Sequence, residues 1–294
     1  MERMPARLPV DGNICRDVEY EQAERNHGKE KRTMETIKER PRILRILASI
    51  LLPSLWLLAA ILLVATAEVV AEYAGAGTDL GMLAGELLGW LPASLLTILY
   101  LDKKHGKPER RPLPAPAFAK ACIGYALLGE MPLQLALRSL GPYDLSGESA
   151  LRIAIGILAA PAVEELAFRA CLFRMSRRGL GFKAAMLLNL AMFAFVHGNM
   201  LGYIIATLPL VAANTAAYER TGDIRICIAF HMTANVLFYL MAGIVIPAYI
   251  AIPLFIACIV LLLRRVFKAA RQPDSALFPL SQGPLQEEPC YPEA

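Results

Sequence analysis

Two adjacent glutamates and an arginine stand inside an apolar stretch of the chain, which reads APAVEELAFR from Ala160 to Arg169. An ionisable side chain at the centre of a membrane helix costs roughly 2.5–3.5 kcal/mol on insertion scales, so each one needs a partner or a purpose. On a helix, Glu165 and Arg169 share one stripe with the acid first, which is the favourable order for an ion pair. Glu164 points to a neighbouring face. A structural ion pair with one spare acid is the plainer alternative.

The proline ahead of the two acids predicts an irregular helix. Pro161 has no N–H group, so the helix is expected to bend or open just before Glu164. Carbonyl groups freed in this way need water or polar partners inside a membrane. The sequence therefore predicts a hydrated cavity at this point.

Two histidines lie in other apolar segments. His197 ends the sequence FAFVH, which begins at Phe193, and His231 precedes Asn235 by four residues. Residues four apart on a helix share a face, so His231 and Asn235 are expected to reach one point in space. A lone histidine in a helix is usually a hydrogen-bonded core residue. Two histidines and a glutamate, all in apolar segments, favour a functional site over a purely structural role.

Residues of these types could hydrolyse an acyl bond. A carboxylate and an imidazole that share a water molecule can remove its proton as it attacks the acyl carbon. A second imidazole and an amide can donate hydrogen bonds to the oxyanion that develops. Because no Ser or Cys falls in a recognisable nucleophile motif, direct attack by water is preferred to a covalent intermediate.

A metal ion is the alternative means of activating the water. Glu164, His197 and His231 would supply one carboxylate and two imidazoles, a ligand set that zinc accepts. The sequence has no HExxH motif, and the positive Arg169 disfavours a dication unless Glu165 neutralises it. Catalysis without a cofactor is therefore expected, with zinc kept open. The six cysteines form no CxxC pair and predict no zinc ribbon.

The elements that position these residues are expected to be membrane helices. Of the 294 residues, 56% are hydrophobic and 19% are charged, whereas soluble domains carry roughly 25% charged residues. This composition excludes a disordered chain and a nucleic-acid binder. Spans are expected at 43–71, 80–101, 116–137, 151–173, 183–197, 201–217, 226–244 and 247–263. Pro209 interrupts the sixth, so eight spans, or seven with a re-entrant element, both fit.

The basic residues predict the orientation, because cytoplasmic loops hold the excess of Lys and Arg. If the chain starts inside, 25 of its 30 Lys and Arg fall on inner segments. Both termini are therefore expected in the cytoplasm. The sequence predicts a polar, basic extension at 1–42, an all-α transmembrane domain at 43–266 with a catalytic core at about 150–240, and a Pro-rich polar tail at 267–294.

Straight helices would keep the two histidines at different depths. Counted at 1.5 Å per residue, His197 would lie ~21 Å from the inner end of its span and His231 only ~8 Å from the inner end of its own. The two rings can meet only if the spans are tilted, broken or differently bounded.

The three motifs together resemble those of the CPBP family, the CAAX protease and bacteriocin-processing family of intramembrane endopeptidases, also called Abi. The likeness covers about residues 150–240, with the motifs in the same order and rough spacing: Glu164-Glu165-x3-Arg169, Phe193-x3-His197 and His231-x3-Asn235. The family often has Gly directly after the arginine, where this chain has Ala170. The resemblance implies an eight-helix bundle with its site in a cavity within the membrane.

The resemblance also implies a role for each motif residue. Glu164 with His197 would activate water, and the oxyanion hole would be formed by His231 and Asn235. The remaining pair, Glu165 and Arg169, would hold the site in shape. The expected partners are a membrane-anchored peptide or protein substrate and the lipid bilayer, and the expected location is a bacterial cytoplasmic membrane. In the CAAX branch of the family, a C-terminal tripeptide is removed from prenylated proteins.

Two other functions remain open at the level of sequence. A transporter would use Glu86, Glu130 and Glu164 as a proton or ion relay across three spans. An inactive family member would serve as an immunity or scaffold protein with the same polar cavity. Every polar group expected of an active enzyme is present, which favours the peptidase.

Overall fold

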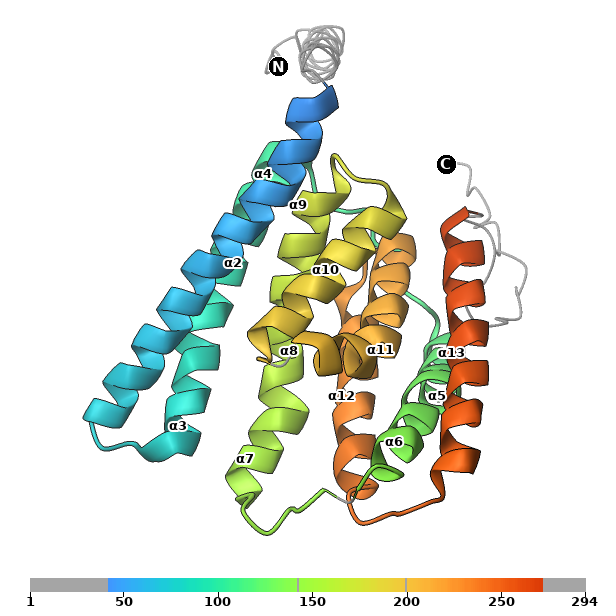
Figure 1. Ribbon diagram of the computed structural model, residues 1–294. Helices are drawn as coiled ribbons and strands as arrows, with labels where there is room; N and C mark the ends of the chain where they lie inside the picture. Colours follow the sequence, from blue (N-terminus) through green and yellow to red (C-terminus); the bar gives the residue numbers. More distant parts are fainter. Residues whose placement is uncertain (1–41, 142, 199, 272–294) are drawn as a thin grey trace, which may run out of the picture. The chain divides into compact units, whose positions relative to one another are not determined.

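A computed structural model describes residues 42–141, 143–198 and 200–271. All regular structure in these ranges is helical (Figure 1), as the sequence predicts. The described residues form eight unbroken helical stretches, at 42–73, 77–105, 115–138, 150–177, 182–196, 200–221, 224–240 and 248–271. Apart from residues 42 and 267–271, the predicted N-terminal extension and C-terminal tail lie outside the described residues.

Each stretch matches one predicted apolar segment, with differences at the ends. The unbroken ones are α2 (Arg42–Tyr73), α10 (Phe182–Val196), α11 (Met200–Thr221), α12 (Ile224–Leu240) and α13 (Ala248–Arg271). Pro209 lies within α11, and the helix continues through it. The last helix runs to Arg271, past the predicted end of the helical domain, because Val266 and Phe267 still pack on the core.

The other three stretches change their winding along their length. One comprises α3 (Gly77–Ala84), η1 (Gly85–Trp90) and α4 (Leu91–His105), and the next α5 (Ala115–Tyr125), η2 (Ala126–Glu130) and α6 (Met131–Arg138). The third, here called the acid helix, comprises α7 (Ala150–Ala154), η3 (Ile155–Ala159), α8 (Ala160–Glu165), η4 (Leu166–Phe173) and α9 (Arg174–Arg177). The segments η1 to η4 are π-helical, which is a wider winding often found at functional sites.

Three of the π segments end directly before a proline-containing turn. The amide groups of Leu91, Met131 and Ala160 each bond to the carbonyl five residues earlier. The next residue in each case is a proline, at 92, 132 and 161. Because proline has no N–H and its ring crowds the preceding turn, the helix widens there instead of breaking. The predicted opening before the acid pair is thus a π segment.

The helices have the apolar surface of a membrane protein. By length and composition, three of those described can cross a bilayer: Arg42–Tyr73, Gly77–His105 and Ala248–Lys268. Phe182–Val196 and Ile224–Leu240 are apolar but shorter. Large apolar side chains such as Leu55 and Leu62 are more than half exposed on α2, as expected for contact with lipid. The number of spans and the position of the termini remain predictions.

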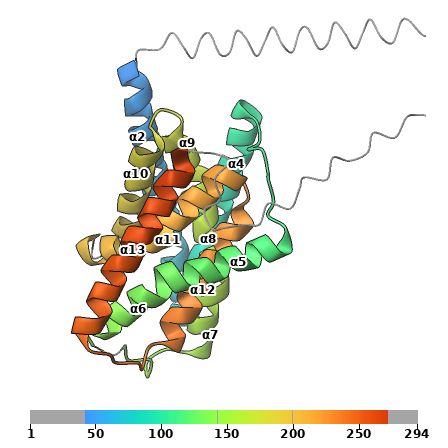
Figure 2. The same ribbon diagram turned by 90° about the vertical axis from the view of Figure 1, so that its right-hand side faces the viewer.

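The packing around α8 determines which side chains can meet there. The chain divides into an N-terminal unit up to Leu47 and a second unit from Ala48 onwards, which contains the acid helix. In this second unit, α12 packs on α8 and on α5 and η2, while α10 packs on η4. Figure 1 shows α10 running obliquely to the acid helix, and Figure 2 shows α5 and α6 as an oblique rod that crosses α12. The acid helix therefore has neighbours on several sides.

Candidate active site

A buried ion pair lies at the centre of the acid helix. Oε2 of Glu165 is 3.1 Å from Nε of Arg169, and both side chains are completely buried. The contact is ionic and not an aligned hydrogen bond, since neither atom makes a hydrogen bond of good geometry within the described residues. The ring of Phe193 also faces the guanidinium, 5.5 Å from its Cζ atom. The pair expected from the four-residue spacing is therefore present.

Glu165 also contacts a histidine of another helix. Its second oxygen, Oε1, lies 2.9 Å from Nδ1 of His231 in α12. A carboxylate accepts hydrogen bonds, so this contact assigns a proton to Nδ1. Glu165 thereby links Arg169 of its own helix to His231 of the neighbouring one. This link fixes the orientation of the imidazole.

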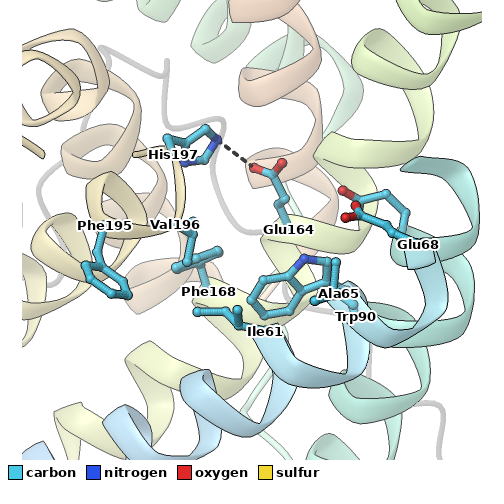
Figure 3. A pocket seen from close by; sticks show the side chains of 11 residues that line it. Ile61, Ala65, Glu68, Trp90, Glu164, Phe168, Phe195, Val196 and His197 are labelled. Atoms are coloured by element: carbon cyan, nitrogen blue, oxygen red, sulfur yellow. Dashed lines mark ion pairs between the residues drawn. The ribbon is translucent and has the colours of Figure 1, made fainter. Parts of the chain in front are cut away.

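Glu164 lies between the two motif histidines. Its Oε2 atom is 4.0 Å from Nε2 of His197 and 3.8 Å from Nε2 of His231. The Glu164 side chain is 15% exposed, His197 is 28% exposed and His231 only 6%. Figure 3 shows His197 and Glu164 pointing toward one another across the pocket. Residues far apart in sequence therefore converge on one carboxylate.

His197 is positioned by the end of its helix. It follows the last residue of α10, and Gly198 after it has a φ of 92°, a left-handed conformation that favours glycine and ends helices. Nδ1 of His197 lies 2.7 Å from the carbonyl oxygen of Phe193, and the Phe193 ring stacks on the imidazole with centroids 4.6 Å apart. Since a carbonyl only accepts, Nδ1 carries the proton and Nε2 faces Glu164. The FxxxH spacing thus holds the ring and fixes its tautomer.

A pocket of about 380 Å³ opens beside Glu164 (Figure 3). Its polar groups are three carboxylates, those of Glu68, Glu86 and Glu164, and the imidazole of His197. The rest of the lining is apolar or aromatic and comes from α2, η1, η4 and α10: Ile61, Val64, Ala65, Trp90, Phe168, Phe195 and Val196. An elongated apolar group could therefore lie against this wall with a polar bond near Glu164.

Asn235 does not line this pocket. Its Nδ2 atom donates a hydrogen bond of 2.6 Å to the carbonyl oxygen of Gly156 in η3. In the π-helical winding, the backbone amide of Ala160 donates to the carbonyl oxygen of Ile155. The amide of the next residue would donate to the carbonyl oxygen of Gly156, but residue 161 is proline and has no N–H. The Asn235 amide supplies the donor that Pro161 lacks. His231 and Asn235 both contact the acid helix, His231 at Glu165 and Asn235 nine residues earlier in the sequence.

Of the two further glutamates in the transporter hypothesis, Glu86 lies with Glu164 in the pocket and Glu130 does not. Glu130 is buried elsewhere, where it accepts hydrogen bonds from the hydroxyl of Tyr125 at 2.8 Å and from Nε2 of Gln134 at 2.7 Å. The three acids of the transporter hypothesis are therefore not brought together in one pocket. Glu130 is the last residue of η2, and η2 packs on α12, the helix that carries His231.

Sequence reasoning missed two polar residues of this region. Glu68 lies in the first apolar segment and faces the pocket. The feature that could have identified it from the sequence is a charged residue near the end of an apolar segment. Asn189 is 1% exposed, and its Nδ2 atom donates to the carbonyl oxygen of Phe168 at 2.8 Å. An amide in an otherwise apolar segment was the signal for Asn189.

The dependence of the site on a metal stays a prediction. Among the described residues, no three His, Cys, Asp or Glu side chains are placed to hold a metal ion. The Nδ1 contact of His231 with Glu165 leaves its Nε2 atom turned toward Glu164. No step of the reaction is therefore derived through a metal, and the response of cleavage to a chelator tests for one.

Fold and site together define a helical membrane protein with a glutamate and a histidine at a pocket and a second histidine 3.8 Å from that glutamate. Residues 146–237 match the family model described as type II CAAX prenyl endopeptidase Rce1-like. The matched range contains all three motifs and confirms the resemblance to the CAAX protease (CPBP) family. The matched family and the apolar helices both indicate a membrane-embedded protease. Neither a curated protein nor a solved structure matches it.

Proposed function

We propose that this protein hydrolyses a peptide bond of a membrane-anchored peptide or protein, using a water molecule activated by Glu164 and His197. The observation that carries the proposal is the position of the Glu164 carboxylate, which lies within 4.0 Å of the Nε2 atoms of both motif histidines. Glu164 and His197 also line the pocket. Substrate and water can therefore reach both groups.

The spacing of these groups suits a bound water. Distances of 3.8 and 4.0 Å exceed those of direct hydrogen bonds, and such a gap is commonly bridged by water. Oε2 of Glu164 is buried and has no hydrogen-bond partner within the described ranges. Because Nδ1 of His197 donates to Phe193, its Nε2 atom is an acceptor in the neutral ring. A water between them would donate one hydrogen to the carboxylate and one to the imidazole.

The reaction then proceeds by direct attack. Glu164, assisted by His197, takes a proton from the water as its oxygen bonds to the carbonyl carbon, and the carbonyl oxygen becomes an oxyanion. Nε2 of His231 donates to this oxyanion when both nitrogens of the ring carry a proton, with Nδ1 donating to Glu165. Asn235 lies outside the pocket lining, and its Nδ2 hydrogen bond to Gly156 instead holds α12 against the acid helix that carries Glu164. The proton then passes to the leaving amine and the bond breaks.

The pocket suggests where the substrate lies. Seven of the eleven lining residues are apolar or aromatic, so we place the membrane-anchored part of the substrate along α2 and α10, with the scissile bond at Glu164. Processing of a prenylated C-terminus is one substrate class that fits this lining. The location that we propose is a bacterial cytoplasmic membrane, with the basic loops and the opening of the pocket on the cytoplasmic side.

The test compares the parent chain with Glu164→Ala, His197→Ala and His231→Ala in liposomes. The probes are a single-span fluorescent peptide and a farnesylated peptide with a CAAX terminus. We expect each substitution to lower cleavage by about 10²- to 10⁴-fold, the usual contribution of acid–base groups, without loss of expression. Variants as active as the parent would overturn the proposal.

Two matched controls separate chemistry from damage to the fold. Glu219→Gln removes a carboxylate that pairs with Arg177 at 2.7 Å, outside the pocket. His105→Ala removes an imidazole that contacts Arg178 at 2.6 Å. Both variants should cleave like the parent. The same preparations loaded with a pH-sensitive dye test the transporter alternative, because a relay would move protons without any cleavage.

A further inference from the structure

One stripe of α10 faces the acid helix. Asn189, Phe193 and His197 are spaced four residues apart, so their side chains lie along the same face. Phe193, in the middle, packs edge-on against Phe168 with ring centroids 4.8 Å apart. At one end of the stripe, His197 reaches Glu164 at 4.0 Å. The other end carries Asn189.

Asn189 makes a polar contact with the backbone of the acid helix. The side chain is 1% exposed, and its Nδ2 atom donates to the carbonyl oxygen of Phe168 at 2.8 Å. Phe168 lies in η4, one residue before Arg169 and three after Glu165. Asn189 therefore ties α10 to the segment that directly follows the acid pair.

A polar contact of this kind can fix the axial alignment of two neighbouring membrane helices. In lipid, apolar side chains gain little by preferring one neighbour over another, so packing and interhelical hydrogen bonds determine the alignment. The stripe of α10 is otherwise aromatic or apolar up to His197. A shift of one helical turn would move His197 by about 5.4 Å, which exceeds its 4.0 Å separation from Glu164.

We propose that Asn189 is a positioning residue for the proposed hydrolysis, on which this inference rests. Its hydrogen bond to the Phe168 carbonyl sets the register of α10 against the acid helix, and this register places His197 beside Glu164. Asn235 makes the equivalent contact from α12 to Gly156, on the other side of the acid pair. The acid helix is thus held by a side-chain amide before and after Glu164 and Glu165.

The matched control for Asn189 is another buried asparagine, Asn214. It is 0% exposed, and its Nδ2 atom donates to the carbonyl oxygen of Cys227 at 3.3 Å, joining α11 to α12. Like Asn189, it has a buried Oδ1 without a hydrogen-bond partner among the described residues. Asn189→Leu and Asn214→Leu therefore each remove one interhelical hydrogen bond, but only the first touches the acid helix.

The first measurement is the rate of peptide cleavage per folded protein. Asn189→Leu should lower kcat by about 10²-fold with little change in KM, the scale of a misplacement of about 1 Å. Asn214→Leu should keep the kcat of the parent, and Asn189→Gln, which retains the donor, should recover part of the lost rate. Equal kcat in Asn189→Leu and the parent, or equal losses in both leucine variants, would overturn the inference.

The second measurement does not depend on activity. Spin labels at positions 158 and 187, whose leucines are both 57% exposed, report the distance between the acid helix and α10. Asn189→Leu should shift or broaden this distance distribution, and Asn214→Leu should leave it unchanged. An unchanged distribution in Asn189→Leu would overturn the inference even if the protein cleaved no peptide. A shifted distribution without cleavage by the parent would instead count against the proposed function alone.

Discussion

Nδ1 of His231 lies 2.9 Å from Oε1 of Glu165, although 66 positions separate the two residues in sequence. The contact joins the first and the third motif. It leaves Nε2 of the same ring 3.8 Å from Glu164. The second glutamate of the motif thus acts on the imidazole as well as on Arg169, and the two adjacent acids have different surroundings.

The first prediction concerns Glu165→Gln. A neutral amide removes the negative charge that stabilises the doubly protonated His231 ring, and it leaves the guanidinium of Arg169 without its carboxylate partner. We expect kcat to fall by about 10²- to 10³-fold, the usual cost of losing a donor to the oxyanion. Single-turnover rates on the membrane peptide measure this effect. Retention of the parent kcat by Glu165→Gln would show that the Glu165 charge is dispensable.

A second prediction concerns Gly89, where η1 approaches α2. A Cβ atom at this position would lie 2.7 Å from Cα and 2.9 Å from the backbone nitrogen of Val64. Backbone atoms cannot rotate away, so Gly89→Ala should displace α2, which carries part of the pocket wall. We expect a loss of about 1–3 kcal/mol, typical of overpacking, and a raised KM.

Gly81→Ala is the control for this displacement. Its Cβ would meet Cγ of Glu72 at 3.6 Å and the carbonyl oxygen of Glu68 at 3.7 Å, which are ordinary contacts. Thermal unfolding in detergent and the KM for the peptide should therefore be unchanged in Gly81→Ala. Equal behaviour of the two variants would contradict the close approach at Gly89.

The third prediction concerns the start of α12. Asp223 accepts a hydrogen bond from the backbone amide of Arg225 at 3.1 Å and caps the helix that carries His231. Asp223→Ala should cost about 1 kcal/mol, as for other N-caps, and lower Tm by about 2–4 °C. Asp144→Ala, in a turn where Asp144 accepts from Ser146, should change Tm much less. Equal Tm values for Asp223→Ala and the parent would contradict the cap.

The same cap predicts a pH dependence of stability. Hydrogen bonds from the Arg225 side chain hold the pKa of Asp223 below its ordinary value of 3.8. The folded state thus favours the ionised carboxylate, so its contribution is complete above that value and is lost as the pH falls through the lowered pKa. Tm measured at descending pH should therefore converge between the parent and Asp223→Ala. A gap that persists at the lowest pH would contradict this assignment.

The fourth prediction is that a chelator leaves cleavage unchanged. Glu165 neutralises Arg169, so the prediction does not rest on the charge of Arg169. It rests on ligand placement, because no three His, Cys, Asp or Glu side chains among the residues described are placed to hold a metal ion. Cleavage should therefore persist in excess phenanthroline, under conditions that inactivate a known zinc peptidase. Loss of activity that zinc restores would contradict metal-free catalysis.

Local spacing predicted some of these features and missed others. The pair Glu165–Arg169 follows from a four-residue spacing within one helix, and the stacking of Phe193 on His197 has the same origin. The meeting of His197 with His231 was not predictable, because it depends on the oblique course of α10. The contact from Asn235 to Gly156 depends on the π winding of η3. The missing N–H of Pro161 predicted an opening before Glu164, but the sequence did not show that the carbonyl of Gly156 would lose its donor and bond to Asn235 instead.

The prolines at 92, 132 and 161 each withhold one amide hydrogen directly after a π segment. At these three sites the helix accommodates the proline by a wider winding, whereas α11 continues through Pro209 without one. The π-helical winding before Glu164 is thus encoded in the sequence and does not depend on ligand binding. Substitutions in the pocket lining on α2 and α10 could therefore change which substrate is recognised, while the backbone around Glu164 stayed the same.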